Sequence, residues 1–216
     1  MAKTLPHPAI PEPGRDCPLC PRLVAFRLEA RAAHPDWWNA PVPSFGPLDA
    51  RLLIVGLAPG MQGANRTGRP FTGDGAGNFL YPKLLQHGLA RGSYRADPKD
   101  GLELVDCRIS NSARCVPPEN KPTPLEVRTC TGTYLKDEIA AMPSLRTILA
   151  LGRIAHDAVS RTLECKPLPA FGHGNVHALD AVTLVDSYHC SRYNLNTGTL
   201  TPAMFDAALD KAKASL

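Results

Sequence analysis

The chain lacks an apolar run approaching the roughly 20 residues that a helix needs to cross a bilayer. Its first residues, MAKTLPHPAIPEPGRD, lack the apolar stretch of a secretory signal peptide. We therefore expect a cytoplasmic protein without membrane contact. It also lacks internal repeats and low-complexity segments. The 216 residues, 44% hydrophobic and 20% charged, predict a single domain over 1–216, with a flexible or extended N-terminal segment over 1–16.

The sequence has little net charge. Its 24 Lys and Arg against 20 Asp and Glu give +4 at pH 7, which is mild beside domains whose whole surface is basic. Residues 51–100 hold the excess, so a bound polyanion is expected to lie against that stretch. A bias of this size also arises by chance, and the charge alone does not identify a partner.

Four short apolar segments predict buried strands: RLLIVGLA from Arg51, LVDCRISN from Leu104, RTILALG from Arg146 and AVTLVDSY from Ala181. Helices are expected over residues 21–33, 75–89, 125–141, 154–163 and 202–214. Continuous apolar strands separated by helices are typical of a parallel sheet covered on both faces. Ligands bind such a sheet where its strands end, so the loops after the strands are the candidate site.

The loop after the first strand, GLAPGMQGANRTGRPFTGDGAG, is rich in glycine, which lets backbone amides approach an anion. It contains neither a Walker loop nor G-x-G-x-x-G, which weakens the case for a kinase or dehydrogenase. Arg66 and Arg69 add positive charge to it. Phe71 predicts stacking on a planar ligand or, alternatively, a plug that holds the loop on the fold. Asp74 stands where it would cap the next helix.

Two other loops carry polar side chains at strand ends. Asn111 ends the second strand, and its amide offers a donor and an acceptor that match a base edge, although it could equally satisfy the turn backbone. His189 follows the fourth strand and could donate a hydrogen bond to a leaving anion, although a lone histidine is more often structural.

Four of the seven cysteines form two pairs, Cys17 with Cys20 and Cys115 with Cys130. Four soft ligands suit zinc or an iron–sulfur cluster, and their spacing does not choose between them or exclude unliganded thiols. The other three, Cys107, Cys165 and Cys190, are expected to be buried small apolar residues.

With these loops in view, the chain resembles the uracil-DNA glycosylase superfamily, and most closely its fifth family, the type-B enzymes. The likeness rests on GLAPGMQGANRTGRPFTGDGAG and HCSRYNLNTGTLT, supported by ISNSARCVPPENKPTP, which resembles a segment of the fourth family. It extends from residue 17 to about residue 201. The resemblance implies a three-layer α/β/α fold with a central four-stranded parallel sheet. It also implies a 4Fe-4S cluster on Cys17, Cys20, Cys115 and Cys130.

The resemblance further implies a monofunctional glycosylase that flips uracil out of DNA and hydrolyses its N-glycosidic bond, leaving an abasic site. We expect a monomer that binds uracil-containing DNA and also accepts other deaminated bases such as hypoxanthine. The implied roles are catalysis by Asp74 and His189, base binding by Phe71, Asn111, Gly60 and Ala58, and DNA binding by Arg66, Arg69, Ser191, Arg192, Tyr193 and Asn194.

Two departures from the family pattern leave questions open. At Ala58 other families carry a polar or acidic residue that positions water, so Asp74 is the nearest candidate for that role, in competition with helix capping. Cys190 replaces the usual proline, and Arg192, Tyr193 and Leu195 all qualify as the residue that inserts into DNA. Two alternative hypotheses are a metal-stapled DNA-binding module without catalysis and an enzyme that acts on free nucleotides.

Overall fold

The computed structural model describes residues 12–216. Residues 1–11 of the expected N-terminal segment lie outside the described residues, and residues 12–20 form coil and turns before the first helix, α1 (Pro21–Ala33). Among the described residues, no helix is both long and apolar enough to cross a bilayer.

A five-stranded sheet forms the centre of the molecule, in the order β4-β1-β5-β7-β6. Four strands are parallel: β4 (Cys107–Asn111), β1 (Leu52–Gly56), β5 (Thr147–Leu151) and β7 (Thr183–Ser187). They confirm the expected parallel core. The fifth strand, β6 (Val176–Ala178), pairs antiparallel with β7. It was not expected, because three partly exposed residues carry no apolar run.

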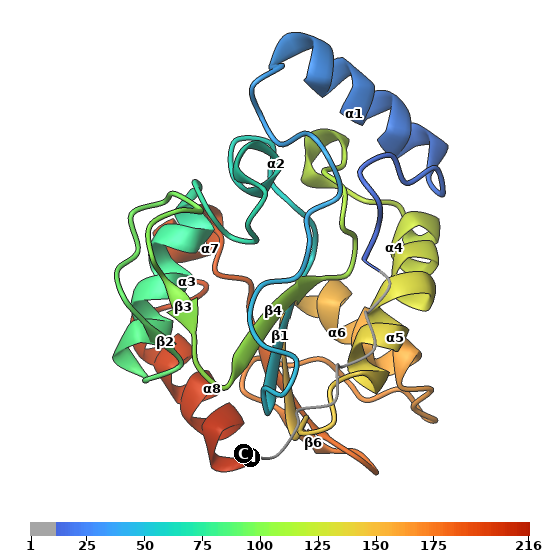
Figure 1. Cartoon of the computed structure of the whole chain (residues 1–216). Helices are drawn as coiled ribbons and strands as arrows, with labels where there is room; N and C mark the ends of the chain where they lie inside the picture. The colour runs from blue at the N-terminus through green and yellow to red at the C-terminus, as the bar shows by residue number, and fades with distance from the viewer. Residues whose placement is uncertain (1–11) are drawn as a thin grey trace, which may run out of the picture.

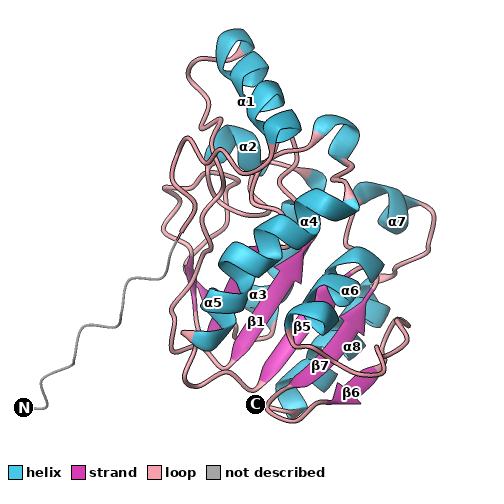
Figure 2. Cartoon of the chain, turned by 90° about the vertical axis from the view of Figure 1, so that its right-hand side faces the viewer, coloured by secondary structure: helices cyan, strands magenta, loops and turns pink. Residues whose placement is uncertain are grey.

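Helices cover both faces of this sheet, as Figure 2 shows. On one face Leu52 and Ile54 share a core with α3 (Gly75–Gln86) and α8 (Pro202–Ala214). On the other face Leu53 and Val55 share a core with α6 (Arg153–Thr162) and with α5 (Lys136–Ala140) and the helical turn before it. Strands buried on both faces explain the continuous apolar runs in the sequence.

The helix expected over 125–141 is built in three pieces: α4 (Pro124–Cys130), a π-helical turn η2 (Thr131–Leu135), and α5. The remaining elements are short and were not expected: α2 (Ala64–Thr67), β2 (Ala90–Arg91), β3 (Glu103–Leu104), η1 (Pro118–Asn120) and α7 (Arg192–Asn196). Cys107 and Cys190 are fully buried, as expected, whereas Cys165 is only half-buried.

The chain passes from β1 to β4 on one side and then crosses to β5 on the other side of β1. Such a reversal of strand order opens a crevice at the carboxyl ends of the strands. In Figures 1 and 2, α1, α2 and α7 lie at that end of the sheet. The loops with unusual sequence therefore meet beside the crevice.

Candidate functional site

A cavity of about 590 Å³ lies at the carboxyl ends of the strands. Its walls come from the glycine-rich loop after β1, from the loop after β4, and from the segment between β7 and α7. Most of the predicted site residues line it: Ala58, Gly60, Phe71, Asp74, Asn111, His189, Ser191 and Arg192. Three loops that are far apart in the sequence thus contribute to one cavity.

Phe71 closes one side of this cavity. Its ring stacks against the His189 imidazole, with 6.0 Å between centroids and 29° between planes. The residue is 7% exposed and has a φ of 51°, a conformation that costs energy and is found where surrounding packing imposes it. Gly56 permits this arrangement, because a Cβ there would lie 2.6 Å from Phe71 Cζ and 2.5 Å from Asn111 Oδ1. Phe71 therefore packs on the fold and borders the cavity at once.

Asn111 ends β4 and is 3% exposed. Its Oδ1 has no hydrogen-bond partner within residues 12–216, so the side chain does not satisfy the turn backbone there. A buried acceptor left without a donor costs about 1–3 kcal/mol. That cost is recovered when a ligand N–H reaches the oxygen.

His189 follows β7 and faces Phe71. The Asn194 Nδ2 donates to the His189 carbonyl over 2.8 Å, which fixes the backbone at this point. Burial lowers the pKa of His189, and the nearby Asp74 only partly opposes that shift. The imidazole is therefore neutral at pH 7 and can donate one hydrogen bond from its ring.

Asp74 uses its two carboxylate oxygens differently. Oδ1 accepts from Gly77 N over 3.0 Å and caps α3, which confirms the capping role. Oδ2 faces the glycine-rich loop, where a Cβ on Gly60 would lie 3.3 Å from it. Since one oxygen is left over from the cap and the residue lines the cavity, capping does not prevent Asp74 from binding water.

Arg69 was expected to bind DNA, but its side chain is buried in the fold. Its side chain is 5% exposed and makes a two-fold ion pair with Asp100, each N–O distance being 2.8 Å. The guanidinium also lies 5.2 Å from the centroid of the Tyr81 ring. The flanking Gly68 and Pro70 gave no sign of this burial, which depends on Asp100, far away in the sequence. Arg69 holds the glycine-rich loop on the fold.

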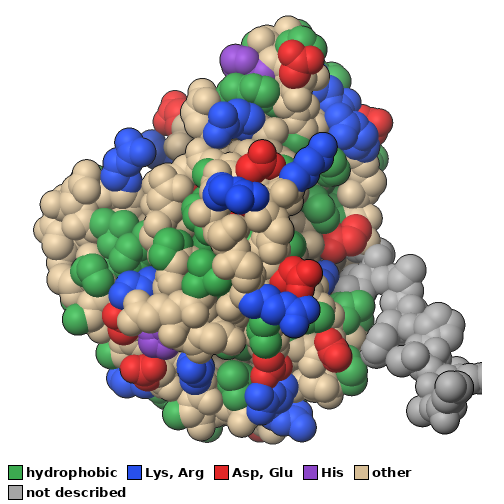
Figure 3. All heavy atoms as spheres, turned by 60° about the vertical axis from the view of Figure 1, so that its left-hand side comes forward, with side chains coloured by type: hydrophobic (Ala, Val, Ile, Leu, Met, Phe, Trp, Pro, Cys, Tyr) green, Lys and Arg blue, Asp and Glu red, His purple; other side chains and the backbone are tan. Residues whose placement is uncertain are grey.

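Part of the basic excess of residues 51–100 is neutralised by ion pairs, while Arg66, Arg95 and Lys99 are exposed and form none among the described residues. Arg51 pairs with Asp106, Lys83 with Asp206, and Arg91 with Glu103. Figure 3 shows Lys and Arg interspersed with Asp and Glu over the face that it presents. Arg66 is exposed near the cavity, and its guanidinium donates to Gln62 O over 3.0 Å.

The segment after His189 forms α7. Ser191 caps this helix by accepting from Asn194 N over 3.3 Å. Tyr193 is 74% exposed, whereas Leu195 packs against the core. Exposure therefore favours Tyr193 over Leu195 as the side chain that reaches out of the protein, with Arg192 beside it at the cavity.

Asn120 also lines the cavity, and the sequence analysis missed it. It has a φ of 57°, and the preceding Glu119 has a φ of 54°. Two consecutive non-glycine residues in the left-handed region are unusual, and such backbone strain concentrates at functional sites. The only signal in the sequence was the Pro-Pro-Glu-Asn run, which predicts a turn and no more.

The four paired cysteines line a second, smaller cavity, together with Arg27, Arg114 and Tyr134. Cys17 and Cys20 precede α1, Cys115 follows β4, and Cys130 ends α4. Their side chains thus come from three segments that the fold brings together. No three of the four sulfur atoms lie within 4.8 Å of one another in the described part of the chain.

Polar neighbours contact three of these sulfurs. The Tyr134 hydroxyl lies 3.4 Å from Cys17 Sγ, Arg114 N donates to Cys130 Sγ over 3.3 Å, and Arg27 Nη1 lies 3.7 Å from Cys115 Sγ. Burial raises the pKa of Cys115 to about 12 and that of Cys130 to about 11. The free thiols of Cys115 and Cys130 are consequently protonated at neutral pH, and metal binding by them releases protons.

Another group of possible metal ligands comprises His156 on α6, His177 on β6 and Asp186 on β7. The His156 Nδ1 lies 2.6 Å from Asp186 Oδ1, and its Nε2 lies 2.9 Å from Pro169 O. Both ring nitrogens of His156 are thus already engaged. These three residues form a hydrogen-bond network that holds the loop before β6 in place.

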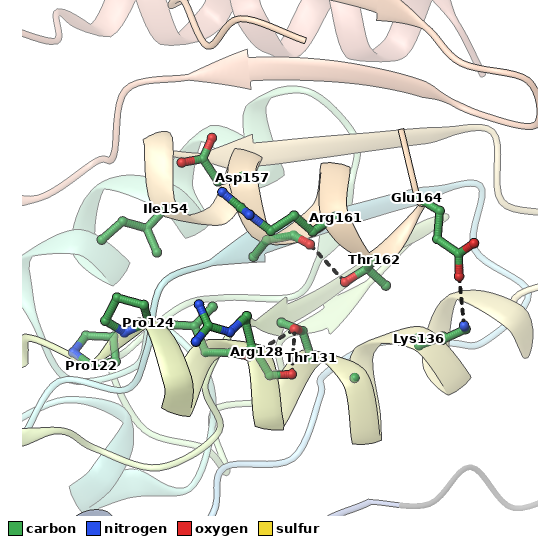
Figure 4. Close-up of a pocket in the computed structure, with 13 residues that line it drawn as sticks. Pro122, Pro124, Arg128, Thr131, Lys136, Ile154, Asp157, Arg161, Thr162 and Glu164 are labelled. Carbon is green, nitrogen blue, oxygen red and sulfur yellow. Dashed lines mark hydrogen bonds and ion pairs between the residues drawn. The ribbon is translucent and has the colours of Figure 1, made fainter. Parts of the chain in front are cut away.

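A further hollow of about 490 Å³ lies between α4, η2 and α6 (Figure 4). Its walls carry Arg128 and Arg161, while Lys136 pairs with Glu164 across 3.1 Å at one end. None of the predicted site residues lines it. The cavity at the strand ends is therefore the candidate active site.

Comparisons with known proteins show which family the chain is similar to. A family model described as "Uracil DNA glycosylase superfamily" matches residues 43–213. A "Type-5 uracil-DNA glycosylase" of Thermus thermophilus is 45% identical over 204 residues, covering 91% of this chain and 92% of that protein. One from Pyrobaculum aerophilum is 39% identical over 203 residues, covering 92% and 88%. A "Type-4 uracil-DNA glycosylase" of the same organism is 33% identical over 146 residues, covering 67% and 60%.

Proposed function

The chain belongs to the uracil-DNA glycosylase superfamily, within its fifth family, and from this premise we propose that its strand-end cavity excises uracil from DNA. The observation that carries the proposal is the convergence of Phe71, Asn111 and His189, from three loops, on one cavity. A metal-stapled binding module without catalysis needs no such convergence.

The cavity suits a flipped base. A base inside a duplex hides its glycosidic bond, so the nucleotide must be extruded before it can react. The Phe71 ring offers a stacking surface that replaces the lost neighbours. Uracil presents an N–H donor next to a carbonyl acceptor, and the Asn111 amide is complementary to that pair. Its unpaired Oδ1 supplies the acceptor for the base N–H.

The exposed α7 segment would fill the gap that the flipped base leaves. We assign the insertion to Tyr193, because it is 74% exposed while the partly buried Leu195 packs against the core. Arg192 is the first residue of this helix and lines the cavity, with its side chain near Gly75. It is placed to meet a phosphate beside the extruded nucleotide.

In the reaction the bond from C1′ to the base nitrogen breaks, and its electron pair leaves with the base. Neutral His189 donates a hydrogen bond to the oxygen on which negative charge collects, and amides of the loop at Gly60 face the same cavity. Water then adds to C1′, and the proton that it loses goes to the base anion, which leaves an abasic site and neutral free uracil. Ala58 places no carboxylate on that water, so Asp74 Oδ2 is the group that would orient it.

A reaction driven by leaving-group stabilisation tolerates several bases. The cavity, at about 590 Å³, has small side chains such as Ala58 and Ala64 on its walls. We therefore propose that hypoxanthine is also a substrate. The monomeric state and the cytoplasmic location remain predictions.

We also propose a 4Fe-4S cluster on Cys17, Cys20, Cys115 and Cys130. A tetrahedral zinc with sulfurs at about 2.3 Å would need them about 3.8 Å apart. The absence of any three described sulfurs within 4.8 Å favours a wider group over a single ion. When bound, the cluster would staple α1 to the ends of β4 and α4, since base excision requires no electron.

Labelled oligonucleotides with one deoxyuridine test the function. Each is incubated with the purified protein, single-stranded or opposite guanine or adenine, and then treated with alkali. Strand scission only after alkali is the expected result. Failure at every pairing, from protein that retains its metal, would favour the non-catalytic module. Weak salt dependence of binding would instead favour an enzyme of free nucleotides.

A further inference from the structure

Arg27 is a buried cation at the cysteine cavity. It lies on α1, where its side chain lines the cavity and its residue is 2% exposed. One terminal nitrogen donates to Cys17 O over 3.0 Å, and the other lies 3.7 Å from Cys115 Sγ. Its Nε has no hydrogen-bond partner among the described residues. A guanidinium in this position is expensive unless a negative charge compensates it.

The neighbouring charges do not supply that compensation. Arg114, the other cation of the cavity, pairs with Glu138 at 2.7 Å and with Glu12 at 3.1 Å. Asp16 pairs with Arg31 at 2.6 Å and its side chain is 75% exposed, so water screens its weaker attraction to Arg27. Within residues 12–216, no carboxylate forms an ion pair with Arg27. The groups left to balance its charge are the cysteine sulfurs.

We propose that Arg27 is the fixed counter-charge of the sulfur ligands and holds the reduction potential of their cluster high. The inference rests on the proposed cluster. Thiolate ligands make the site negative, and each electron added to the cluster makes it more so. A fixed positive charge a few ångströms from Cys115 stabilises the electron-rich state, because charge and hydrogen bonds at the sulfurs set the potential. The same charge disfavours loss of an electron and so protects the cluster from oxidation.

Tyr134 provides a matched comparison at the same site. Its hydroxyl lies 3.4 Å from Cys17 Sγ, so it contributes a hydrogen bond without a formal charge. Removing that hydroxyl should alter the potential less than removing the charge of Arg27. Comparing variants of Arg27 and Tyr134 therefore separates the effect of charge on the potential from the effect of hydrogen bonding.

The test is a spectroelectrochemical titration of the cluster in the full chain, prepared anaerobically. Parent protein is compared with Arg27→Lys, Arg27→Gln and Tyr134→Phe. We expect a clear negative shift in Arg27→Gln, a smaller one in Tyr134→Phe, and a potential near that of the parent in Arg27→Lys. The rate at which air bleaches the visible absorption should rise in the same order as the potential falls.

Equal potentials in Arg27→Gln and the parent would overturn the proposal. If Arg27→Gln purifies without iron, retention of iron by Arg27→Lys supports the charge requirement, and loss from both variants overturns it. Iron and sulfide analysis of the parent protein tests separately whether the cluster is present. Parent protein that contains neither iron nor sulfide would refute the cluster. Uracil excision by the same preparation tests the enzymatic function independently.

Discussion

Replacing Asn111 with leucine should make the free protein more stable and the enzyme nearly inactive. Leucine has a similar volume, and it removes a buried Oδ1 that has no partner in the described structure. Relief of an unpaired buried acceptor is worth about 1–3 kcal/mol, offset in part by imperfect packing. In a chain of this size each kcal/mol moves the melting temperature by about 2–4 °C, so we expect a rise of a few degrees.

Activity should change in the opposite direction. A bidentate contact to a base edge is worth about 1–3 kcal/mol, so single-turnover excision should fall about 10- to 100-fold. Asn65 is the matched control, because it is 1% exposed but its Nδ2 donates to Asn39 Oδ1 over 2.9 Å. Asn65→Leu breaks a satisfied pair and should lower the melting temperature. The reasoning is refuted if Asn111→Leu melts earlier than the parent, or if it excises uracil at the parental rate.

The other predictions concern the reaction and the loops. His189→Ala should slow single-turnover excision at least about tenfold, and because burial lowers the pKa of His189, the parental rate should show no His189 inflection between pH 6.5 and 8. Asp74→Asn keeps a cap for α3, so its melting temperature should hold while excision falls; full activity would remove the carboxylate from water activation. Arg69→Met should destabilise the fold by about 3–5 kcal/mol, because it leaves Asp100 buried and unpaired, and denaturant titration measures this. The pKa of Asp100 lies below its ordinary value, so the stability from this pair is present above about pH 4 and lost as the pH falls further, which acid titration of the fold checks. Tyr193→Ala should reduce excision from duplex more than from single strands, and an equal loss on both would contradict insertion.

The fold was predictable where one local pattern decided it. Apolar runs marked β1, β4, β5 and β7, because strands buried on both faces need no alternation. The sequence did not predict β6, because its three residues form a strand only by pairing with β7, which is a tertiary interaction. The π-helical turn η2 likewise has no signal in a segment that otherwise reads as one helix.

The site was predictable where loop chemistry had no structural explanation. One cavity is lined by Phe71, Asn111 and His189. The loops that carry them follow β1, β4 and β7, and these parallel strands all end at the same edge of the sheet. Arg69 was misread, since its ion pair with Asp100 joins residues 31 positions apart. Asn120 was missed for a related reason: its backbone conformation, and not its type, brings it to the cavity.

The most direct test of the central claim is detection of the released base. Protein with its metal is incubated with a duplex that carries one deoxyuridine opposite guanine, and mass spectrometry counts free uracil while alkali reveals abasic sites. We predict one uracil for each abasic site, with both products formed at least about tenfold more slowly in Asn111→Leu and His189→Ala. Abasic sites without free uracil, or no product from active-site-intact protein, would contradict excision at this cavity.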